Sequence, residues 1–133
     1  MKQSFKATCV HAEDMGDYLL VGFADDKYET VDYLTFQRSH ESDEQDVALG
    51  MDTVHVERND QAHSDYGGMR CVILFPNLLR VEFDESGMEF MDGLDHTEVE
   101  FDLPLERFEA LRSALKRCFA KLDFYYDYSE GIP

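Results

Sequence analysis

Hydrophobic and polar residues follow short repeating patterns over most of the chain. Strands are expected where apolar residues recur at every second position, or where β-branched and aromatic residues form a run between turn residues. These signals predict strands at residues 4–11, 18–24, 33–38, 51–58, 69–75, 78–84 and 95–102. Pro76-Asn77 predicts a tight turn between residues 69–75 and 78–84.

The turn signals become regular after residue 83. The short run 88–91 lies between two Gly-containing turns, which is typical of a further strand in an antiparallel meander. In the run 95–102, Thr97, Val99 and Phe101 alternate with polar residues, so one face of that strand is expected to lie against a core and the other in water. Two segments fit neither pattern and are predicted to be loops: residues 39–50 and 59–68.

A helical period replaces the alternation near the C-terminus. Pro104 suits the first turn of a helix, and apolar residues then recur at intervals of three and four positions. These residues are Leu105, Phe108, Leu111, Leu115, Cys118, Phe119 and Leu122. We therefore predict one domain of the α+β class, spanning residues 1–133, in which an antiparallel β-sheet meander carries a C-terminal helix packed on one face.

The composition adds a strong negative charge to this picture. Apolar residues make up 44% of the 133 positions, which is too many for a disordered acidic chain, so the protein is expected to fold. There are 29 acidic and 12 basic residues, and the formal net charge is −17. Such a field repels nucleic acid and attracts a cationic partner, although a solvated surface with no particular partner would have the same composition.

Cysteine usage and apolar content bear on the location of the protein. Cys9, Cys71 and Cys118 are odd in number and have no C-x-x-C spacing, so they predict neither a disulfide framework nor a zinc site. The N-terminus has no apolar run of signal-peptide length, and no apolar run reaches the roughly eighteen residues that a membrane span needs. We therefore expect a reduced cytoplasmic protein that does not associate with a membrane.

Signals for catalysis are weak in this sequence. His96, Glu98 and Glu100 share one strand face, but strand neighbours point in parallel and do not converge on one metal ion, so cross-strand pairing with Arg80 is the favoured interpretation. Residues 63–65 contain the residue types of a nucleophilic triad, yet consecutive residues cannot adopt its geometry. No compact hydrolase, nucleotide-binding or metalloprotease motif occurs, so we predict no enzymatic activity, no cofactor and no metal.

The predicted loops contain the densest acidic clusters, and loops on a rigid sheet are common binding surfaces. The predicted partner-binding residues are Glu41, Asp43, Glu44, Asp46, Asp60, Asp65 and Tyr66. The acidic residues would steer a basic partner, and Tyr66 would anchor it beside Gly67-Gly68. Tyr125, Tyr126 and Tyr128 are a second candidate surface, although packing against the domain is the favoured role for them.

The middle of the chain resembles a known protein family. The features that carry the resemblance are Gln37-Arg38, Asp43-Glu44-Gln45-Asp46, Leu49-Gly50-Met51-Asp52, Asn59-Asp60-Gln61 and Tyr66-Gly67-Gly68. Over roughly residues 4–85 the sequence is similar to the immunity protein 10 family of bacterial polymorphic toxin systems. The resemblance implies a small intracellular protein that binds and neutralises a cognate toxin protein and has no enzymatic role. It implies no particular contact residues.

The charge and the resemblance agree with each other. Many toxins of these systems are nucleases, and their basic clefts would attract an acidic partner. Two other functions are compatible with the sequence: a small ligand-binding domain or enzyme that uses an exposed sheet face, and an interaction adaptor unrelated to toxins. A homo-oligomer is compatible with the sequence but is not predicted from it.

Overall fold

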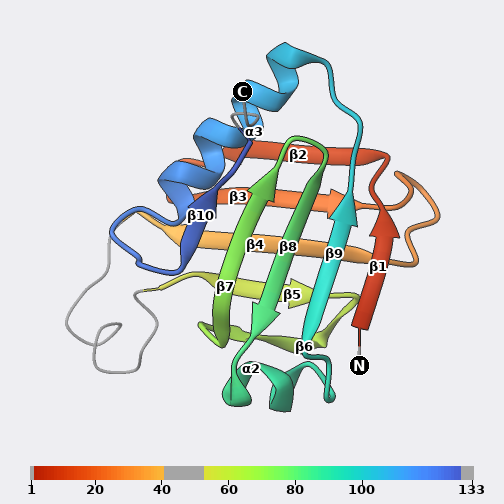
Figure 1. Ribbon diagram of the computed structural model, residues 1–133, viewed down its shortest axis with the longest axis vertical. Coiled ribbons are helices and arrows are strands. Elements are labelled where there is room, and N and C mark those ends of the chain that lie inside the picture. Colours follow the sequence, from red (N-terminus) through yellow and green to blue (C-terminus); the bar gives the residue numbers. More distant parts are fainter. Residues whose placement is uncertain (1, 41–52, 130–133) are drawn as a thin grey trace.

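The computed structural model of the protein describes residues 2–40 and 53–129, which form two five-stranded β-sheets packed face to face (Figure 1). The first sheet contains, in spatial order, β1 (Lys2–Lys6), β9 (His96–Glu100), β8 (Leu78–Phe83), β7 (Met69–Phe75) and β10 (Tyr125–Asp127). The second sheet contains β2 (Cys9–Asp14), β3 (Tyr18–Ala24), β4 (Tyr33–Ser39), β5 (His55–Arg58) and β6 (Asp60–Tyr66). The helices in this part of the chain are α2 (Glu85–Phe90) and α3 (Leu105–Cys118). In Figure 1 the strands of the first sheet run in front of those of the second and cross them.

The two sheets differ in strand direction. The second sheet is an antiparallel meander from β2 to β6. In the first sheet β7, β8 and β9 pair antiparallel, whereas β1 joins β9 and β10 joins β7 in parallel. The predicted α+β class is confirmed, as is the turn at Pro76-Asn77. The predicted strands are nevertheless divided between two sheets.

The chain changes sheet inside the segment predicted as a strand at residues 4–11. The N–H of Ala7 donates to the carbonyl of Glu100 (2.7 Å), which extends the pairing of the first sheet. The N–H of the next residue, Thr8, donates to the carbonyl of Ala24 in the second sheet (3.0 Å). The prediction of one continuous strand was therefore wrong, because the partners that separate β1 from β2 are distant in sequence.

Three other segments also differ from the prediction. Residues 88–91 were predicted to be a strand, but the segment lies in and just after α2, where the Asp84 carboxylate caps the helix by accepting from the N–H of Gly87 (2.8 Å). Residues 59–68 were predicted to be a loop, but they contain β6, a polar edge strand held by its pairing with β5. In the segment 51–58, the strand within the described residues is β5, and residues 51–52 lie outside the described residues. The loop predicted at 39–50 falls, from residue 41 onward, outside them as well.

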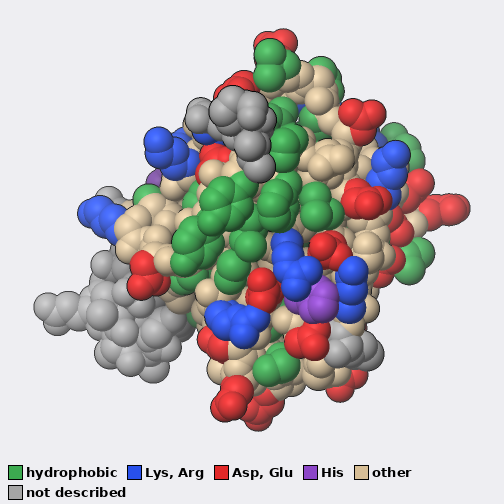
Figure 2. Space-filling view, in the orientation of Figure 1, with side chains coloured by type: hydrophobic (Ala, Val, Ile, Leu, Met, Phe, Trp, Pro, Cys, Tyr) green, Lys and Arg blue, Asp and Glu red, His purple; other side chains and the backbone are tan. Residues whose placement is uncertain are grey.

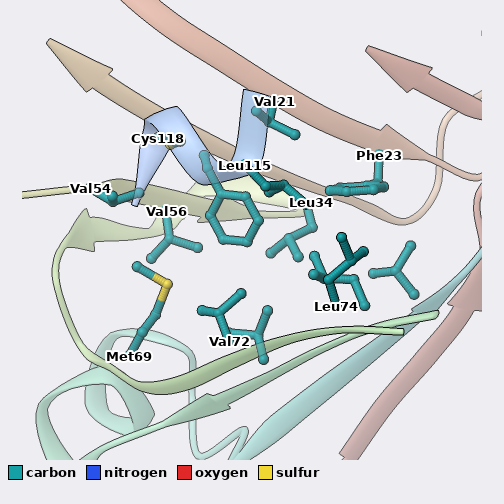
Figure 3. Packing of buried hydrophobic residues seen from close by; sticks show 14 of the residues in the cluster. Val21, Phe23, Leu34, Val54, Val56, Met69, Val72, Leu74, Leu115 and Cys118 are labelled. Atoms are coloured by element: carbon teal, nitrogen blue, oxygen red, sulfur yellow. The ribbon is translucent and has the colours of Figure 1, made fainter. Parts of the chain in front are cut away.

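The core lies between the two sheets and against helix α3 (Figure 3). The labelled side chains come from both sheets and from the helix, and they include Val21, Phe23, Leu34, Val56, Val72, Leu74, Leu115 and Cys118. Helix α3 packs against β2, β3 and β4, so the predicted packing of a C-terminal helix on one face is confirmed. Leu105, however, was predicted to join the buried stripe and is 74% exposed, because the first turn of the helix lies beyond the edge strand β2 (Figure 1).

Arg38 of β4 fixes the C-terminal end of α3. Its Nη1 atom donates to the carbonyls of Cys118 (2.9 Å) and Ala120 (2.6 Å). Carbonyls at a helix end have no partner within the helix, and a positive charge there complements the helix dipole. The chain continues from this point into β10 at the edge of the first sheet. Within residues 2–40 and 53–129, no helix has both the length and the apolar character needed to cross a membrane.

Candidate partner-binding surface

The outer face of the second sheet presents aromatic and polar side chains to solvent. Each strand turns apolar residues such as Val21, Phe36 and Val56 toward the core and the alternate residues outward. The strand register places the outward residues of β3 to β6 in adjacent rows. We call this surface the second-sheet face, and it includes Tyr18, Tyr33, Thr35, Gln37, His55, Glu57, Ser64 and Tyr66.

One row of the second-sheet face borders a shallow cavity. Gln37 of β4 lies opposite His55 of β5, which in turn lies opposite Tyr66 of β6. The rings of His55 and Tyr66 meet edge to face, with centroids 5.0 Å apart. The cavity has a volume of about 120 Å³ and is lined by Asp17, Tyr18, Gln37, Ser39, His55 and Tyr66. Because pockets for small ligands usually hold roughly 300 Å³ or more, this cavity suits a single side chain of a protein partner.

A hydrogen-bonded pair lies in the next rows of the same face. The Tyr33 hydroxyl donates to Oε2 of Glu57 (2.5 Å). Burial of the phenol, followed by the adjacent Glu57 carboxylate, raises the pKa of Tyr33 to about 12. Tyr33 therefore stays protonated at neutral pH and serves as a hydrogen-bond donor, not as a base.

The second sheet and its turns are rich in acidic residues. Residues 9–40 and 53–66, which form the second sheet and its turns, contain ten acidic and three basic residues. Several of these acidic side chains accept backbone N–H groups: Asp26 accepts those of the second and third residues after it at 2.9 Å, and Asp25 accepts another at 3.0 Å. A neutral N–H group holds a carboxylate in place without cancelling its charge. This side of the molecule therefore keeps a negative field.

A larger groove of about 560 Å³ lies between α3 and β10. It is lined by Glu109, Arg112, Ser113, Lys116, Tyr125 and Asp127. Nε of Arg112 donates to Oδ2 of Asp127 (2.6 Å), so charges in the groove neutralise each other. The groove has no converging set of acid, base and nucleophile. In the part of the chain that the structure describes, no group of His, Cys, Asp or Glu side chains could hold a metal ion.

The predicted site residues fall in three places. Glu41, Asp43, Glu44 and Asp46 lie outside the described residues. Tyr66 is half-buried on the second-sheet face, where it meets Tyr18 and His55 around the shallow cavity. Asp60 and Asp65 are exposed on the same strand, but Asp60 lies at its opposite end, whereas Oδ1 of Asp65 accepts from the backbone N–H of Tyr66 (2.7 Å). The structure therefore places Asp65 next to Tyr66 and Asp60 away from it.

Sequence reasoning missed Tyr18, Gln37 and His55 as candidates for the site. Each lies at an outward position of a segment that was predicted to be a strand. The alternation was thus a signal that these side chains face solvent. Their grouping around one cavity depends on strand register, and the alternation does not predict strand register.

A comparison with protein families establishes the affiliation of the chain. The family model described as Immunity protein 10 matches residues 6–109. The chain belongs to the immunity protein 10 family. The resemblance noted in the sequence is thereby confirmed, and membership of the immunity protein 10 family implies an immunity protein whose partner is a toxin. A search of curated proteins finds no match to the chain.

Several of the features that carried the resemblance to immunity protein 10 have structural roles. Asn59 adopts a left-handed conformation (φ 62°), and its side chain accepts from the N–H of Tyr33 (2.9 Å) and donates to Asp32 (3.0 Å). Gly68 has φ +75°, and a Cβ atom there would lie 2.6 Å from the ring of Phe90. Such residues preserve the fold of an immunity protein 10 member.

Proposed function

We propose that the protein neutralises a cognate bacterial toxin domain in the cytoplasm by binding it, without catalysing a reaction. Membership of the immunity protein 10 family carries this proposal. The partner is a protein and not a nucleic acid, because a chain with a net charge of −17 repels a polyanion.

The proposed contact surface is the second-sheet face with the acidic residues around it. The charge of this side supports the choice, since ten acidic residues outnumber three basic ones in residues 9–40 and 53–66. The shallow cavity beside Tyr66 supports it as well, because a half-buried aromatic ring next to a small cavity is a typical anchor point in protein interfaces. Glu41, Asp43, Glu44, Asp46, Asp60 and Asp65 stay predicted contributors to the attraction.

The toxin domain that such a surface would attract is basic. Nucleases have basic clefts for their substrates, so a nuclease toxin is the favoured partner. An acidic surface seated in that cleft would exclude the nucleic acid. The same geometry would serve against any toxin whose active surface carries a positive charge.

Charge reversal tests the attraction. Replacing Glu41, Asp43, Glu44 and Asp46 together with Lys should slow association with the toxin by about tenfold or more at low salt and flatten its salt dependence, because rim charges act mainly on the encounter rate. The control replaces four exposed acidic residues elsewhere with Lys: Glu85, Glu89, Asp102 and Glu106. Surface plasmon resonance at low and high salt measures both variants. Equal effects of the two variants would assign the attraction to net charge alone.

A second substitution tests the anchor. Tyr66→Ala should speed dissociation by about tenfold or more, because a buried aromatic contact acts on the lifetime of a complex. Tyr28→Ala, at a position that is 86% exposed in the β3–β4 connection, is the control and should leave dissociation unchanged. Circular dichroism melting confirms that both variants fold. Unchanged dissociation in a folded Tyr66→Ala variant would remove the second-sheet face from the contact surface. If toxin binding depended neither on the four acidic residues nor on Tyr66, the proposed mode of binding would be contradicted.

A further inference from the structure

Residues 71–75 of strand β7 are apolar on both faces of the strand. Val72 and Leu74 point into the core and are fully buried, while Ile73 and Phe75 point outward from the first sheet. A strand with one face in water normally alternates apolar with polar residues, and a strand that is apolar on both sides is typical of a sheet covered on both sides. Among the described residues, the core covers only the inner side of β7. The outward side of β7 is therefore expected to be buried against a further surface.

The outward residues of β7 belong to a continuous apolar patch. The register places Tyr126 of β10 beside Ile73, and Leu78 of β8 beside Phe75. Tyr126 and Tyr128 are 44% and 57% exposed and stack on each other with centroids 6.3 Å apart. Figure 2 shows hydrophobic side chains gathered over the centre of this face. We call these five residues the apolar patch: Ile73, Phe75, Leu78, Tyr126 and Tyr128.

The three C-terminal tyrosines therefore have two roles. Tyr125 stacks on Phe119 with centroids 5.2 Å apart, so it packs into the domain in the manner favoured from the sequence. Tyr126 and Tyr128 extend outward instead. Tyr126 lies on β10, and the N–H of Tyr128 just after it donates to the carbonyl of Leu74 (2.8 Å), so the backbone of both tyrosines is held in place. Exposed tyrosines are common at the centres of protein interfaces.

The rest of the same sheet face carries balanced charges. Arg80 interacts with Glu82 and Glu98 (each 3.3 Å), Lys2 interacts with Glu98 (2.5 Å), and Arg70 pairs with Glu82. The pairing of Arg80 with Glu98 across β8 and β9 was predicted from the sequence and is confirmed. Basic and acidic residues thus alternate beside the apolar patch, in a chain whose net charge is −17. This face is the electrically balanced side of an acidic molecule.

The charge balance of this face discriminates between two partners for the apolar patch, a basic toxin and a second copy of the chain. A basic toxin surface gains little attraction from a face whose acidic groups are already paired with arginine and lysine. Two copies of a chain with a net charge of −17 repel each other, and this repulsion is weakest where balanced faces meet. An apolar centre with a polar rim is also the usual composition of a homodimer interface.

We infer that two copies of the chain associate through the outer face of the first sheet, with a two-fold axis passing through the apolar patch. The patch of one copy then covers the patch of the other, so that the outward side of β7 is buried in both copies. The charged rows of β8, β9 and β1 lie at the rim. The inference adds a homodimer that the sequence did not predict, and it does not rest on the proposed toxin binding, which uses the second-sheet face.

Sedimentation equilibrium of the full chain tests the inference. A monomer of 15.4 kDa should be replaced by a species of about twice that mass at concentrations of about 1–100 μM, the range of many weak homodimers. Added NaCl should strengthen the dimer, because salt screens the repulsion between two acidic bodies. Toxin binding should show the opposite salt dependence.

Paired substitutions locate the interface. Tyr126→Lys with Tyr128→Lys makes the chain less negative and so lowers the long-range repulsion, but it should weaken the dimer by about 100-fold because two cations enter the apolar patch. Tyr28→Lys with Val31→Lys makes the same charge change at positions that are 86% and 73% exposed in the β3–β4 connection, and it should not weaken the dimer. Leu78→Lys in β8 tests the patch without altering β10. Thermal melting shows whether each variant is folded.

Three results would overturn the homodimer. The chain could stay monomeric at about 500 μM in high salt, well above the range of weak specific interfaces. The dimer could persist in folded Tyr126→Lys/Tyr128→Lys and Leu78→Lys variants. The chain could be monomeric while the same substitutions weaken toxin binding, which would assign the apolar patch to the toxin. Loss of toxin binding in the Tyr66 and charge-reversal variants bears only on the second-sheet face.

Discussion

At the scale of single residues, Asp14 connects three separate segments of the chain. Its Oδ1 atom accepts from the N–H of Gly16 (2.9 Å) and lies 2.8 Å from Nε2 of His40, and its Oδ2 atom accepts from Arg117 of α3 (3.2 Å). The N–H of Gly16, followed by the His40 side chain, lowers the pKa of Asp14 to about 2. The ionised form of Asp14 is therefore the form that the folded protein favours.

This lowered pKa predicts a specific pH dependence. A carboxylate with a lowered pKa stabilises the folded state above its unfolded pKa of about 4, and this contribution is lost as the pH falls toward about 2. Asp14→Asn should therefore destabilise the protein near neutral pH, and the difference from the wild type should shrink between about pH 4 and pH 2. Urea unfolding over this pH range measures it. Asp102→Asn, which changes another exposed carboxylate, is the control, and a difference that does not depend on pH would contradict the assignment.

At the scale of elements, helix α3 divides into a buried part and an exposed first turn. Leu111, Leu115 and Cys118 are buried, whereas Leu105 has the same apolar character but is 74% exposed. The helix is thus stabilised by its contact with the second sheet over its later turns and by Arg38 at its end. The spacing of the apolar residues alone predicts that Leu105 and Leu115 are equally buried.

The two leucines should therefore respond differently to truncation. Leu115→Ala should lower the free energy of unfolding by about 2 to 5 kcal/mol, because it leaves a cavity in the core. Leu105→Ala removes the same atoms from the surface and should change the free energy by less than about 0.5 kcal/mol. Phe108→Ala, at a half-buried position, should fall between them. Chemical denaturation measures all three, and equal losses for Leu105 and Leu115 would show that the first turn is buried in solution.

At the scale of the whole molecule, the points where the chain passes between the sheets fix the architecture. One is the step from Ala7 to Thr8, and the other is Gly67-Gly68, between β6 and β7. Both glycines have positive φ angles, of 70° and 75°. At Gly68 a Cβ atom would also lie 2.6 Å from the ring of Phe90 and 2.8 Å from Cα of Gly87. Close packing of α2 against this crossing therefore requires glycine.

Substitution of Gly68 should destabilise the join between the sheets. Gly68→Ala combines the strain of a left-handed conformation with overpacking against α2 and should cost about 2 to 5 kcal/mol of stability. Gly93→Ala is a matched control, because Gly93 has φ +85° but nothing lies within 4 Å of its Cβ position. It should cost about 1 to 2 kcal/mol, from backbone strain alone. Thermal and urea unfolding of both variants measure the difference, and equal losses would show that α2 moves aside without cost.

Local patterns in the sequence were enough to predict most strands, the helix and the family. Residues 18–24, 33–38 and 69–75 were predicted as strands and lie in strands, because alternation and β-branched runs report on the two sides of one strand. The helix was predicted from Pro104 onward and begins at Leu105. The resemblance to the immunity protein 10 family rested on short motifs that are present in the chain itself, so no structure was needed to find it.

The way these elements combine depends on contacts between segments that are distant in the sequence. β6 is mostly polar, and its identity as a strand comes from hydrogen bonds to β5. The division into two sheets depends on the distant partners of Ala7 and Thr8. The two candidate surfaces also depend on strand register. Register places Tyr66 beside His55 on the second sheet and Tyr126 beside Ile73 on the first sheet. Local pattern fixes which side of a strand is apolar, whereas hydrogen bonding between distant segments fixes which side chains become neighbours.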